Sequence, residues 1–154
     1  MLKSVAEVMT REPITVKAET PLGEAIKILA EKRISGLPVV DDAGHLIGII
    51  SETDLMWQQA GVTPPAYFVI FDSVIYLKNP LEYERELHKA LGQTVGEVMS
   101  KKPITISPDK LLREAARMMR DSKIHRLPVL DDSEQVIGIL SLGDIIRDMA
   151  QSQG

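Results

Sequence analysis

Residues 37–55 read LPVVDDAGHLIGIISETDL, and residues 127–145 read LPVLDDSEQVIGILSLGDI. The two stretches lie 90 positions apart and share Leu-Pro-Val, Asp-Asp, Ile-Gly-Ile and Ser-x-x-Asp at matching places. The match extends without a gap from residues 5–55 onto residues 95–145, with 21 of 51 positions identical. Chance does not give a match of this length, so the chain contains an internal repeat.

The two copies predict the same order of secondary structure. In the first copy we expect, in chain order, an amphipathic turn at 5–9, a strand over 14–16, a helix with Pro21 at its first position, strands over 37–40 and 46–50, and a helix from residue 52. The predicted fold class is therefore α/β (α+β), with the order strand–helix–strand–strand–helix occurring twice. Each copy is small for an independent core, so we expect the two copies to bury their apolar faces against each other.

A segment of 37 residues, 56–92, has no counterpart in the repeat, and we interpret it as an apolar insert. Its residues 66–77, AYFVIFDSVIYL, favour a strand by composition, but they are long for one strand, so their structure stays open. Asn79-Pro80-Leu81-Glu82 predicts a capping box with Pro at the first helical position. The helix behind it should end at Gly92 and carry on one face Tyr83, Leu87, Ala90 and Leu91.

An exposed segment as apolar as 66–77 would be a liability, so it needs a cover. Three interpretations stay open: the segment covers the module's own core, it forms a dimer contact or an effector-binding surface, or it closes over a ligand cleft as a lid. We divide the chain at 1–57, 58–92 and 93–154, and expect the two outer segments to form one module.

The composition argues against several classes of protein. Six residues are aromatic, all between Trp57 and Tyr83, whereas 44% of the chain is apolar, so the repeats must have an aliphatic core. Without cysteine there is no disulfide, thiolate metal site or cysteine nucleophile. A net charge of −4 gives no basic field for nucleic acid. The first residues lack the pattern of a signal peptide, and no apolar run is long enough to span a bilayer, so we expect a cytoplasmic protein.

The sequence lacks the common catalytic motifs. The three histidines, His45, His88 and His125, form no H-x-x-x-H pair, and neither G-x-G-x-x-G nor a P-loop is present. The turn at 41–44, DDAG, lacks the alternating oxygen ligands of a calcium loop. We therefore predict no catalytic residues and no metal site.

The repeated residues resemble the CBS motif, named for cystathionine β-synthase. The resemblance covers both copies, about two thirds of the chain, and rests on Val-Met-x-x-x-Pro, Leu-Pro-Val-x-Asp-Asp and Ile-Gly-Ile-x-Ser-x-x-Asp. It implies two β-α-β-β-α motifs paired around a pseudo-two-fold axis, with a cleft on each side, in modules that dimerise into a flat disc. It also implies clefts that bind adenosine compounds, and regulation of an effector, here a separate protein.

The second helix of each copy opens with Ser51-Glu52-Thr53-Asp54 or with Ser141-Leu142-Gly143-Asp144. Taken alone, these residues predict helix capping, although a capping box favours the longer Glu or Gln over Asp. A helix N-terminus also offers free N–H groups and a positive dipole end to an anion. The resemblance implies that Asp54 and Asp144 accept hydrogen bonds from ribose hydroxyls. It also implies contacts to ribose or phosphate from Ser51, Thr53 and Ser141.

His125 and Arg126 precede the second strand of the second copy. Taken alone, Arg126 would be a solvated loop charge, and His125 would be a buried or surface histidine with a local partner. The resemblance implies that basic residues at this point face the phosphates of the ligand, which the planar fork of Arg126 suits, and His125 would make affinity pH-dependent. The matching Ser35 and Gly36 carry no charge. We therefore expect the two sites to differ, with the cleft of the second copy binding the phosphorylated ligand more tightly.

Two pairs of short segments are candidates for an adenine slot. Taken alone, they would be plain core residues. The resemblance implies that some of them hold the ring between aliphatic side chains, while backbone groups contact its edge. The candidates are Ile14, Thr15, Ile104 and Thr105 in the first strands, and Pro38, Val39, Pro128 and Val129 in the second strands.

Together these observations predict a non-catalytic regulatory module of the energy-sensing type. It would bind AMP, ADP or ATP, form a homodimer and act on a separate effector protein. The alternative ligands are S-adenosylmethionine and a dinucleotide. Two rivals of other classes are a structural dimerisation module with degenerate clefts and a nucleotide-hydrolysing enzyme, against which the missing catalytic set argues.

Overall fold

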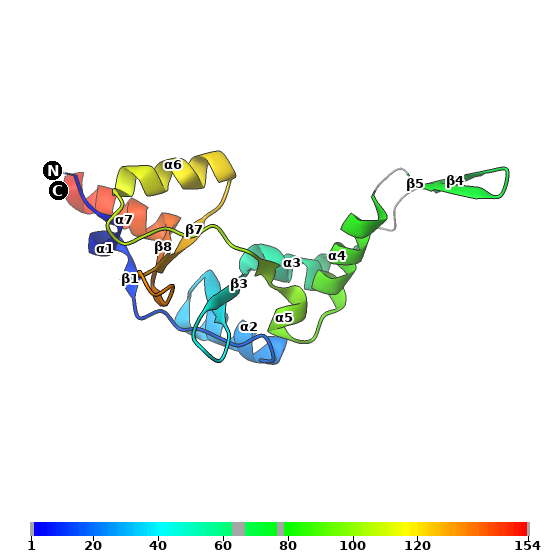
Figure 1. The fold of residues 1–154 in the computed structure, drawn as a ribbon, viewed down its shortest axis with the longest axis horizontal. Helices are drawn as coiled ribbons and strands as arrows, with labels where there is room; N and C mark the ends of the chain where they lie inside the picture. The colour runs from blue at the N-terminus through cyan, green and yellow to red at the C-terminus, as the bar shows by residue number, and fades with distance from the viewer. Residues whose placement is uncertain (1, 63–66, 77–78, 154) are drawn as a thin grey trace.

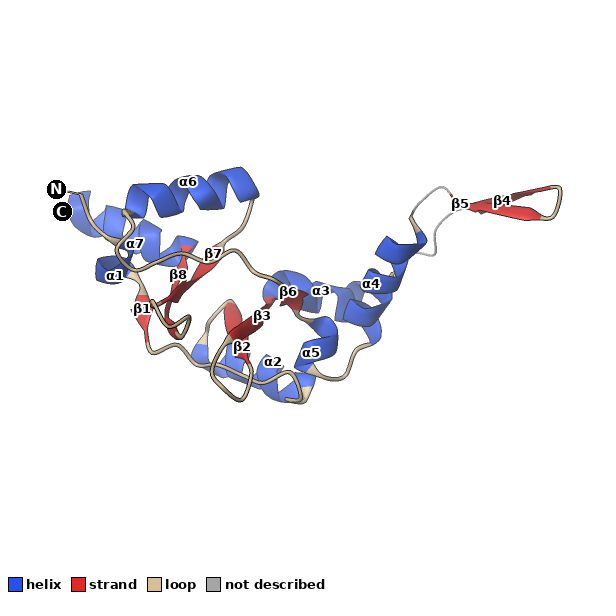
Figure 2. Cartoon of the chain, viewed as in Figure 1, coloured by secondary structure: helices blue, strands red, loops and turns tan. Residues whose placement is uncertain are grey.

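The computed structural model describes residues 2–62, 67–76 and 79–153. The first repeat contains α1 (Val5–Val8), β1 (Thr10–Arg11), α2 (Leu22–Lys32), β2 (Gly36–Val40), β3 (Leu46–Ser51) and α3 (Glu52–Ala60). Between the repeats lie β4 (Tyr67–Ile70), β5 (Ser73–Tyr76) and α4 (Pro80–Leu91). The second repeat contains α5 (Val95–Val98), β6 (Ser100–Lys101), α6 (Leu112–Ser122), β7 (Arg126–Leu130), β8 (Val136–Ser141) and α7 (Leu142–Gln153). The predicted mixed α/β class is confirmed, and Figure 2 shows how the short strands lie among the helices.

The two repeats exchange their first strands. β2 and β3 form an antiparallel hairpin, and the third strand of their sheet is β6 of the other repeat. β7 and β8 form the matching hairpin, which β1 completes. The registers match as well, because Thr10 pairs with Ile139 and Ser100 pairs with Ile49. Each three-stranded sheet therefore draws strands from both repeats.

The two hydrophobic cores follow the same exchange. The first core takes two residues from the second repeat, and its buried members are Val16, Leu22, Ala25, Leu29, Leu37, Val39, Ile50, Val95 and Val98. The second core takes two residues from the N-terminal turn, and its buried members are Val5, Met9, Ile106, Ala115, Met119, Leu127, Val129 and Leu140. Both cores are aliphatic, as the composition predicts. The repeats are thus joined by shared cores.

Glycine is required where the exchanged strands meet the hairpins. A Cβ atom at Gly48 would lie 2.9 Å from the carbonyl oxygen of Ser100, and one at Gly138 would lie 3.0 Å from that of Thr10. Backbone atoms cannot give way as a flexible side chain can, so larger residues would push the third strand out of each sheet. The central residue of each Ile-Gly-Ile motif is therefore explained by the exchange.

The predicted first strand is placed differently in the structure. The strand expected over 14–16 is reduced to an isolated parallel bridge between Val16 and Val39, while the regular pairing occurs earlier, in β1. The cause is a turn at Glu12, whose φ of 47° is followed by Pro13, which has no N–H to donate to a ladder. Pro21 is the N-cap of α2 and not its first helical residue.

Residues 67–76 form a β-hairpin. β4 and β5 pair from Tyr67–Tyr76 to Ile70–Ser73, and the two turn residues, Phe71 and Asp72, both have positive φ, as a type I′ turn requires. The sequence left the structure of segment 66–77 undecided, and its described residues form two strands. Residues 66 and 77 lie outside the described part.

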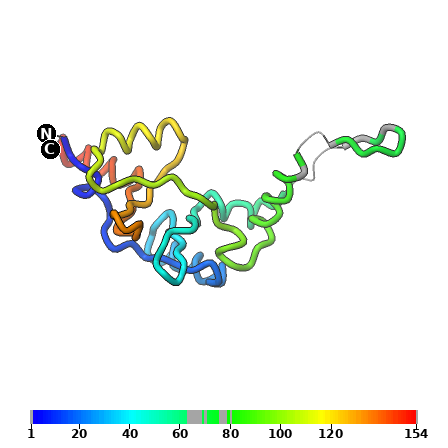
Figure 3. The backbone as a smooth tube through the Cα atoms, in the orientation of Figure 1, coloured from blue at the N-terminus to red at the C-terminus, as the bar shows by residue number. Residues whose placement is uncertain are grey.

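The hairpin does not cover the module's own core. Figures 1 and 3 show it beyond α4, far from the two three-stranded sheets, whereas the two chain ends lie together at the opposite end of the molecule. Phe71 is 95% exposed and Val69 is 60% exposed. The interpretation of this segment as a cover for the core is therefore wrong for the described residues.

The helix predicted from Asn79 is present as α4, and Figure 1 places it beside α3. The Asn79 side chain caps it by accepting a hydrogen bond from the backbone N–H of Leu81 at 2.9 Å, and Gly92 is its C-cap. The predicted apolar face is only partly buried. Leu91, the last residue of the helix, is 71% exposed.

Candidate functional site

Among the pockets of the described residues, two clefts are lined by matching positions of the two repeats. The larger, cleft A, has a volume of about 460 Å³ and is lined by Thr10, Glu12, Pro13, Ile14, Arg33, Ile34, Ser35, Gly36, Glu52, His125, Arg126, Ile139, Ser141, Leu142, Gly143, Asp144 and Arg147. The smaller, cleft B, has a volume of about 360 Å³ and is lined by Ile49, Ser51, Thr53, Asp54, Ser100, Lys101, Lys102, Pro103, Ile104, Lys123, Ile124, His125 and Arg126.

Each cleft is formed by both repeats. Cleft A combines residues 10–14 and 33–36 of the first repeat with residues 139–147 of the second. Cleft B combines residues 100–104 and 123–126 of the second repeat with residues 49–54 of the first. Most lining positions of the two clefts therefore correspond through the offset of 90, which follows from the exchange of strands. Neither cleft belongs to one copy alone, so the tighter site predicted for the cleft of the second copy cannot be assigned to one repeat.

Asp54 and Asp144 are buried at matching places, 3% and 7% exposed, each near the start of a helix. One carboxylate oxygen of each residue caps its own helix. Oδ2 of Asp54 accepts the Ser51 backbone N–H at 3.0 Å, and Oδ2 of Asp144 accepts that of Ser141 at 2.9 Å. The predicted capping is therefore present, and it uses only one oxygen, so that Oδ1 is left for further partners.

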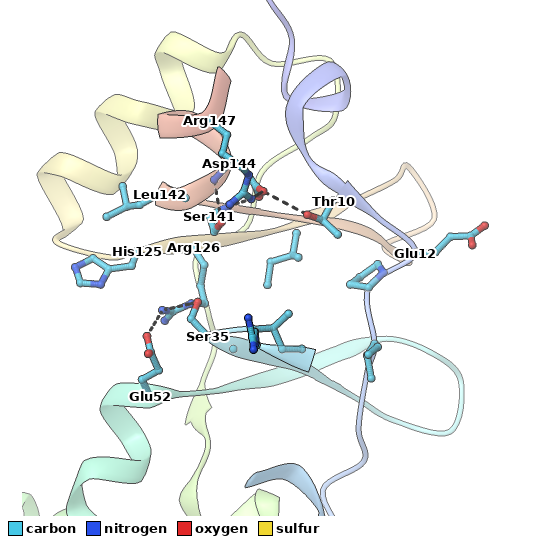
Figure 4. Close-up of a pocket in the computed structure, with 17 residues that line it drawn as sticks. Thr10, Glu12, Ser35, Glu52, His125, Arg126, Ser141, Leu142, Asp144 and Arg147 are labelled. Atoms are coloured by element: carbon cyan, nitrogen blue, oxygen red, sulfur yellow. Dashed lines mark hydrogen bonds and ion pairs between the residues drawn. The ribbon is translucent and has the colours of Figure 1, made fainter. Parts of the chain in front are cut away.

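The partners of Oδ1 differ between the clefts. In cleft A, Oδ1 of Asp144 lies 2.5 Å from Nη2 of Arg147 and 3.4 Å from the Thr10 hydroxyl, as Figure 4 shows. In cleft B, Oδ1 of Asp54 accepts the Ser100 hydroxyl at 2.8 Å and the Lys89 ammonium at 2.5 Å. The Lys89 ammonium also donates to the backbone carbonyl of Val98 at 2.9 Å.

Arg126 lies between the two clefts and contributes to both. Its guanidinium donates to the hydroxyl of Ser35 from Nε at 3.3 Å and from Nη2 at 3.2 Å, and Nη2 lies 3.7 Å from the Glu52 carboxylate. Figure 4 shows the side chain reaching from its strand across to both residues. Burial lowers the pKa of Arg126 from its ordinary value, while the charges of Glu52 and Asp54 oppose this shift.

The matching residue across the pair is Gly36, and it makes room for Arg126. A Cβ atom at Gly36 would lie 2.6 Å from Cδ of Arg126 and 3.0 Å from its Nε. The two positions cannot both carry a long side chain, so the pair is asymmetric at its centre. From the sequence, Gly36 is only a position without charge, whereas in the structure it makes room for the charged side chain of the other repeat.

Arg33 and Lys123 are basic in both copies and occupy matching strained positions. They are the C-caps of α2 and α6, with φ of 53° and 55°. Helices usually place glycine or asparagine in this left-handed conformation, which disfavours long side chains. Arg33 lines cleft A and Lys123 lines cleft B. A basic residue retained at a strained position in both clefts is consistent with a role in binding.

The structure separates the predicted adenine-slot residues into two groups. Ile14 lines cleft A and Ile104 lines cleft B, where they are 40% and 42% exposed. Thr15 and Thr105 follow them in the chain but line neither cleft.

The second group, Pro38, Val39, Pro128 and Val129, is fully buried. The carbonyls of Pro38 and Pro128 accept the backbone N–H groups of Val16 and Ile106, both at 3.1 Å, so these groups are occupied within the fold. Both faces of β2 are covered, and its side chains belong to the core.

Several residues of the two sites were not predicted. Thr10 and Ser100 are hydroxyl residues at matching positions. The alignment of the two copies could have identified them as candidates. Lys101 and Lys102 directly precede Pro103, but no pattern marks them as cleft residues before the strand exchange is known. Lys89 has no counterpart in the first repeat, so nothing in the sequence connects it with Asp54.

The described part of the chain holds no group of three or more histidine, aspartate or glutamate side chains able to bind a metal ion. Within the same residues, no helix combines the length and the apolar character needed to cross a membrane. The hairpin positions whose side chains the structure describes, 69 and 71–75, line neither cleft A nor cleft B.

The family model described as the CBS domain matches residues 5–61 and 95–151. The chain is 33% identical over 140 residues to the chloroplastic CBS domain-containing protein CBSX2 of Arabidopsis thaliana, and the match covers 88% of this chain and 58% of that protein. For CBSX1 of the same plant the identity is 32% over 154 residues, which cover 96% of this chain and 64% of that protein. The chain thus spans less than two thirds of either plant relative.

Two solved structures have similar folds. The crystal structure of CBSX2 in complex with AMP has a TM-score of 0.80 and 29% identity, and covers 96% of this chain and 97% of that one. The CBS domain pair of protein MJ0100, in complex with 5′-methylthioadenosine and S-adenosyl-L-methionine, has a TM-score of 0.76 and 26% identity, with 99% of both chains covered.

Proposed function

This chain belongs to the CBS domain family, and on that premise we propose that it is a non-catalytic regulatory module that binds adenosine compounds between its repeats. Ligand binding in the clefts would regulate a separate effector protein. We further propose that the module acts as a homodimer in the cytoplasm. AMP, ADP and ATP are the favoured ligands, and S-adenosylmethionine or a dinucleotide is the alternative.

The observation that carries this proposal is the pair of buried aspartates in the two clefts. Asp54 and Asp144 each use one oxygen to cap a helix, and the other accepts from Lys89 of α4 in the case of Asp54 and from Arg147 of the same helix in the case of Asp144. A carboxylate oxygen has more than one acceptor site and suits the vicinal hydroxyls of ribose. We propose that Ser51, Thr53 and Ser141, which line the clefts beside them, contact ribose or phosphate.

The apolar lining supports binding of a flat, largely apolar ring. Ile14 and Ile104 are large aliphatic residues that stay about two-fifths exposed at matching places in the two clefts. Ile34 and Ile139 line cleft A as well, and adenine contacts would bury such surface. Arg126 and His125 border both clefts, and the Arg126 fork is suited to phosphate oxygens. The neighbours CBSX2 and MJ0100 bind AMP, 5′-methylthioadenosine or S-adenosylmethionine, all of which contain adenosine.

A thermal-shift screen of the full chain tests the proposal directly. AMP, ADP, ATP, adenosine, S-adenosylmethionine and NAD should be compared, because a ligand raises the melting temperature only if it binds the folded state. We expect a shift with at least one of the first four, and calorimetry should then show that Arg126→Ala weakens binding of the phosphorylated compounds. Unchanged AMP and ATP affinity in this variant would remove Arg126 from the site.

Asp144→Asn is the matched test of the aspartate role. The amide keeps the volume of the side chain but lacks the charge and one acceptor oxygen, so ligand binding in cleft A should weaken about tenfold or more. Gly23→Ala, at an open position of α2, serves as the control that leaves both clefts unchanged. If no adenosine compound shifts the melting temperature, the structural dimerisation module becomes the better account.

A further inference from the structure

We propose that the two clefts take adenosine compounds of different charge: cleft B binds a phosphorylated compound, and cleft A binds one that carries no phosphate chain. This inference rests on the proposed function, because it assigns a ligand class to each of the same two sites. It rests on the charged side chains that the strand exchange brings to each cleft. Arg126 lines both clefts, so its charge alone does not distinguish them.

Cleft B is strongly basic. Its cationic lining residues are Lys101, Lys102, Lys123 and Arg126, and its single carboxylate is that of Asp54. The Asp54 charge is already neutralised by Lys89, at 2.5 Å. Among the residues that the structure describes, Lys101, Lys102 and Lys123 have no ion-pair partner. Cleft B thus presents three uncompensated ammonium groups to a ligand, which suits a chain of phosphates.

Cleft A has balanced charges. Its cationic residues are Arg33, Arg126 and Arg147, and its carboxylates are those of Glu12, Glu52 and Asp144. Two of the arginines are engaged, because Arg126 lies 3.7 Å from Glu52 and Arg147 lies 2.5 Å from Asp144. A phosphate would have to displace a carboxylate to reach Arg126 or Arg147, whereas the charge of Arg33 is balanced by that of Glu12 in the same cleft. Such a ligand gains little net electrostatic energy.

One pair of matching positions reverses its sign between the clefts. Glu12 in cleft A corresponds to Lys102 in cleft B, and both have a left-handed backbone, with φ of 47° and 52°. Each directly precedes the proline and the isoleucine that line the same cleft. The backbone therefore carries a carboxylate and an ammonium to equivalent places. Figure 4 shows Glu12 at the end of cleft A away from His125.

His125 does not create the difference, since it lines both clefts. Its protonation would add a charge beside each cleft at once. The other ionisable groups that line the two clefts are those given above. Cleft B still has three lysines without an ion-pair partner among the described residues, and cleft A still has equal numbers of cations and carboxylates. Selection by charge therefore does not depend on the state of the imidazole.

The reversed position allows a charge exchange that tests the inference on the full chain. Calorimetry with ATP and with adenosine should show that the unmodified chain binds one ATP more tightly than any second. Lys102→Glu should weaken that ATP site about tenfold and leave adenosine binding unchanged. Glu12→Lys should strengthen ATP binding in cleft A by a similar factor and bring a second ATP into the measurable range. Lys27→Glu, on the exposed face of α2, makes the same charge change away from both clefts and is the control.

Ionic strength gives an independent readout. Raising the salt concentration from low to physiological should weaken ATP binding in cleft B and leave adenosine binding unaltered, because salt screens exposed charges. Lys101→Glu and Lys123→Glu serve as second variants if Lys102→Glu lowers the melting temperature. Two ATP molecules bound with equal affinity would overturn the inference, as would Lys102→Glu and Glu12→Lys both behaving like Lys27→Glu. If instead neither ATP nor adenosine binds the unmodified chain, the proposed function itself fails.

Discussion

Cleft A and cleft B hold the same aspartate in two different ways. In cleft A, Asp144 is paired with Arg147 of its own helix, whose side chain is 69% exposed. In cleft B, Asp54 is paired with Lys89 of α4, whose side chain is 23% exposed, and Lys89 also binds the Val98 carbonyl. The first contact is local and solvated, whereas the second connects the cleft to the helix that follows the β4–β5 hairpin. The same aspartate thus makes different stabilising contacts in the two repeats.

Replacement of Lys89 should have the largest effect of the changes that separate the clefts. Lys89→Met removes the cation from a carboxylate that is 4% exposed, so the free energy of unfolding should fall by about 3 kcal/mol. Urea denaturation at neutral pH, with equal m-values for both chains, measures the loss.

The matched change in cleft A is Arg147→Met, and it should lower the free energy of unfolding by less than about 1 kcal/mol, because the arginine is mostly exposed. The double variant Lys89→Met with Asp54→Asn should recover part of the loss, since the amide leaves no unpaired charge. Equal losses for Lys89→Met and Arg147→Met would show that the two contacts do not differ as described.

Gly48→Ala and Gly138→Ala test a feature that the two repeats share, in contrast to the aspartate contacts, which differ. Each added methyl group would meet the carbonyl of an exchanged strand at 2.9 or 3.0 Å. We expect each variant to lose about 2 kcal/mol of unfolding free energy, measured by the same denaturation experiment. A loss at only one of the two glycines would mean that the exchanged strands contribute unequally to stability.

Gly36→Ala should have a small effect on stability, below about 1 kcal/mol, because the closest contact of the added methyl group, at 2.6 Å, is the side chain of Arg126, while the backbone carbonyl oxygen of Ile50 lies farther away at 3.4 Å. It should nevertheless displace Arg126 from Ser35 and change the affinity for ATP. Calorimetry alongside thermal unfolding separates the two results. Unchanged ATP affinity with unchanged stability would show that the position of Arg126 is not set by the space at Gly36.

Much of the fold could be predicted because the repeat displays each element twice. The hairpins of both repeats and the helix start at Glu52 follow from apolar runs, turn residues and capping serines. The exchange of β1 and β6 could not be predicted, because a two-residue strand carries no periodic pattern that identifies its partner. Pairing over such a sequence distance is a tertiary property.

Part of the candidate site could also be predicted from the repeat. Asp54 and Asp144 stood out because they are polar, duplicated and placed at helix starts. Pro38 and Val39 were misplaced, because a strand buried on both faces shows no alternation that separates a cleft face from a core face. Lys89 was missed because its pairing with Asp54 depends on how α4 packs, which no local sequence pattern specifies.

The exchange of β1 also sets an order of events during synthesis of the protein. Thr10 has no strand to pair with until Ile139 has been made, and Val5 and Met9 enter a core whose other buried members begin at Ile106. The first repeat likewise waits for residues 95–101 before its own sheet and core are complete. Translation of one repeat therefore leaves an unfinished structure on the ribosome, with its N-terminal turn unprotected, and folding can finish only when nearly the whole chain has emerged.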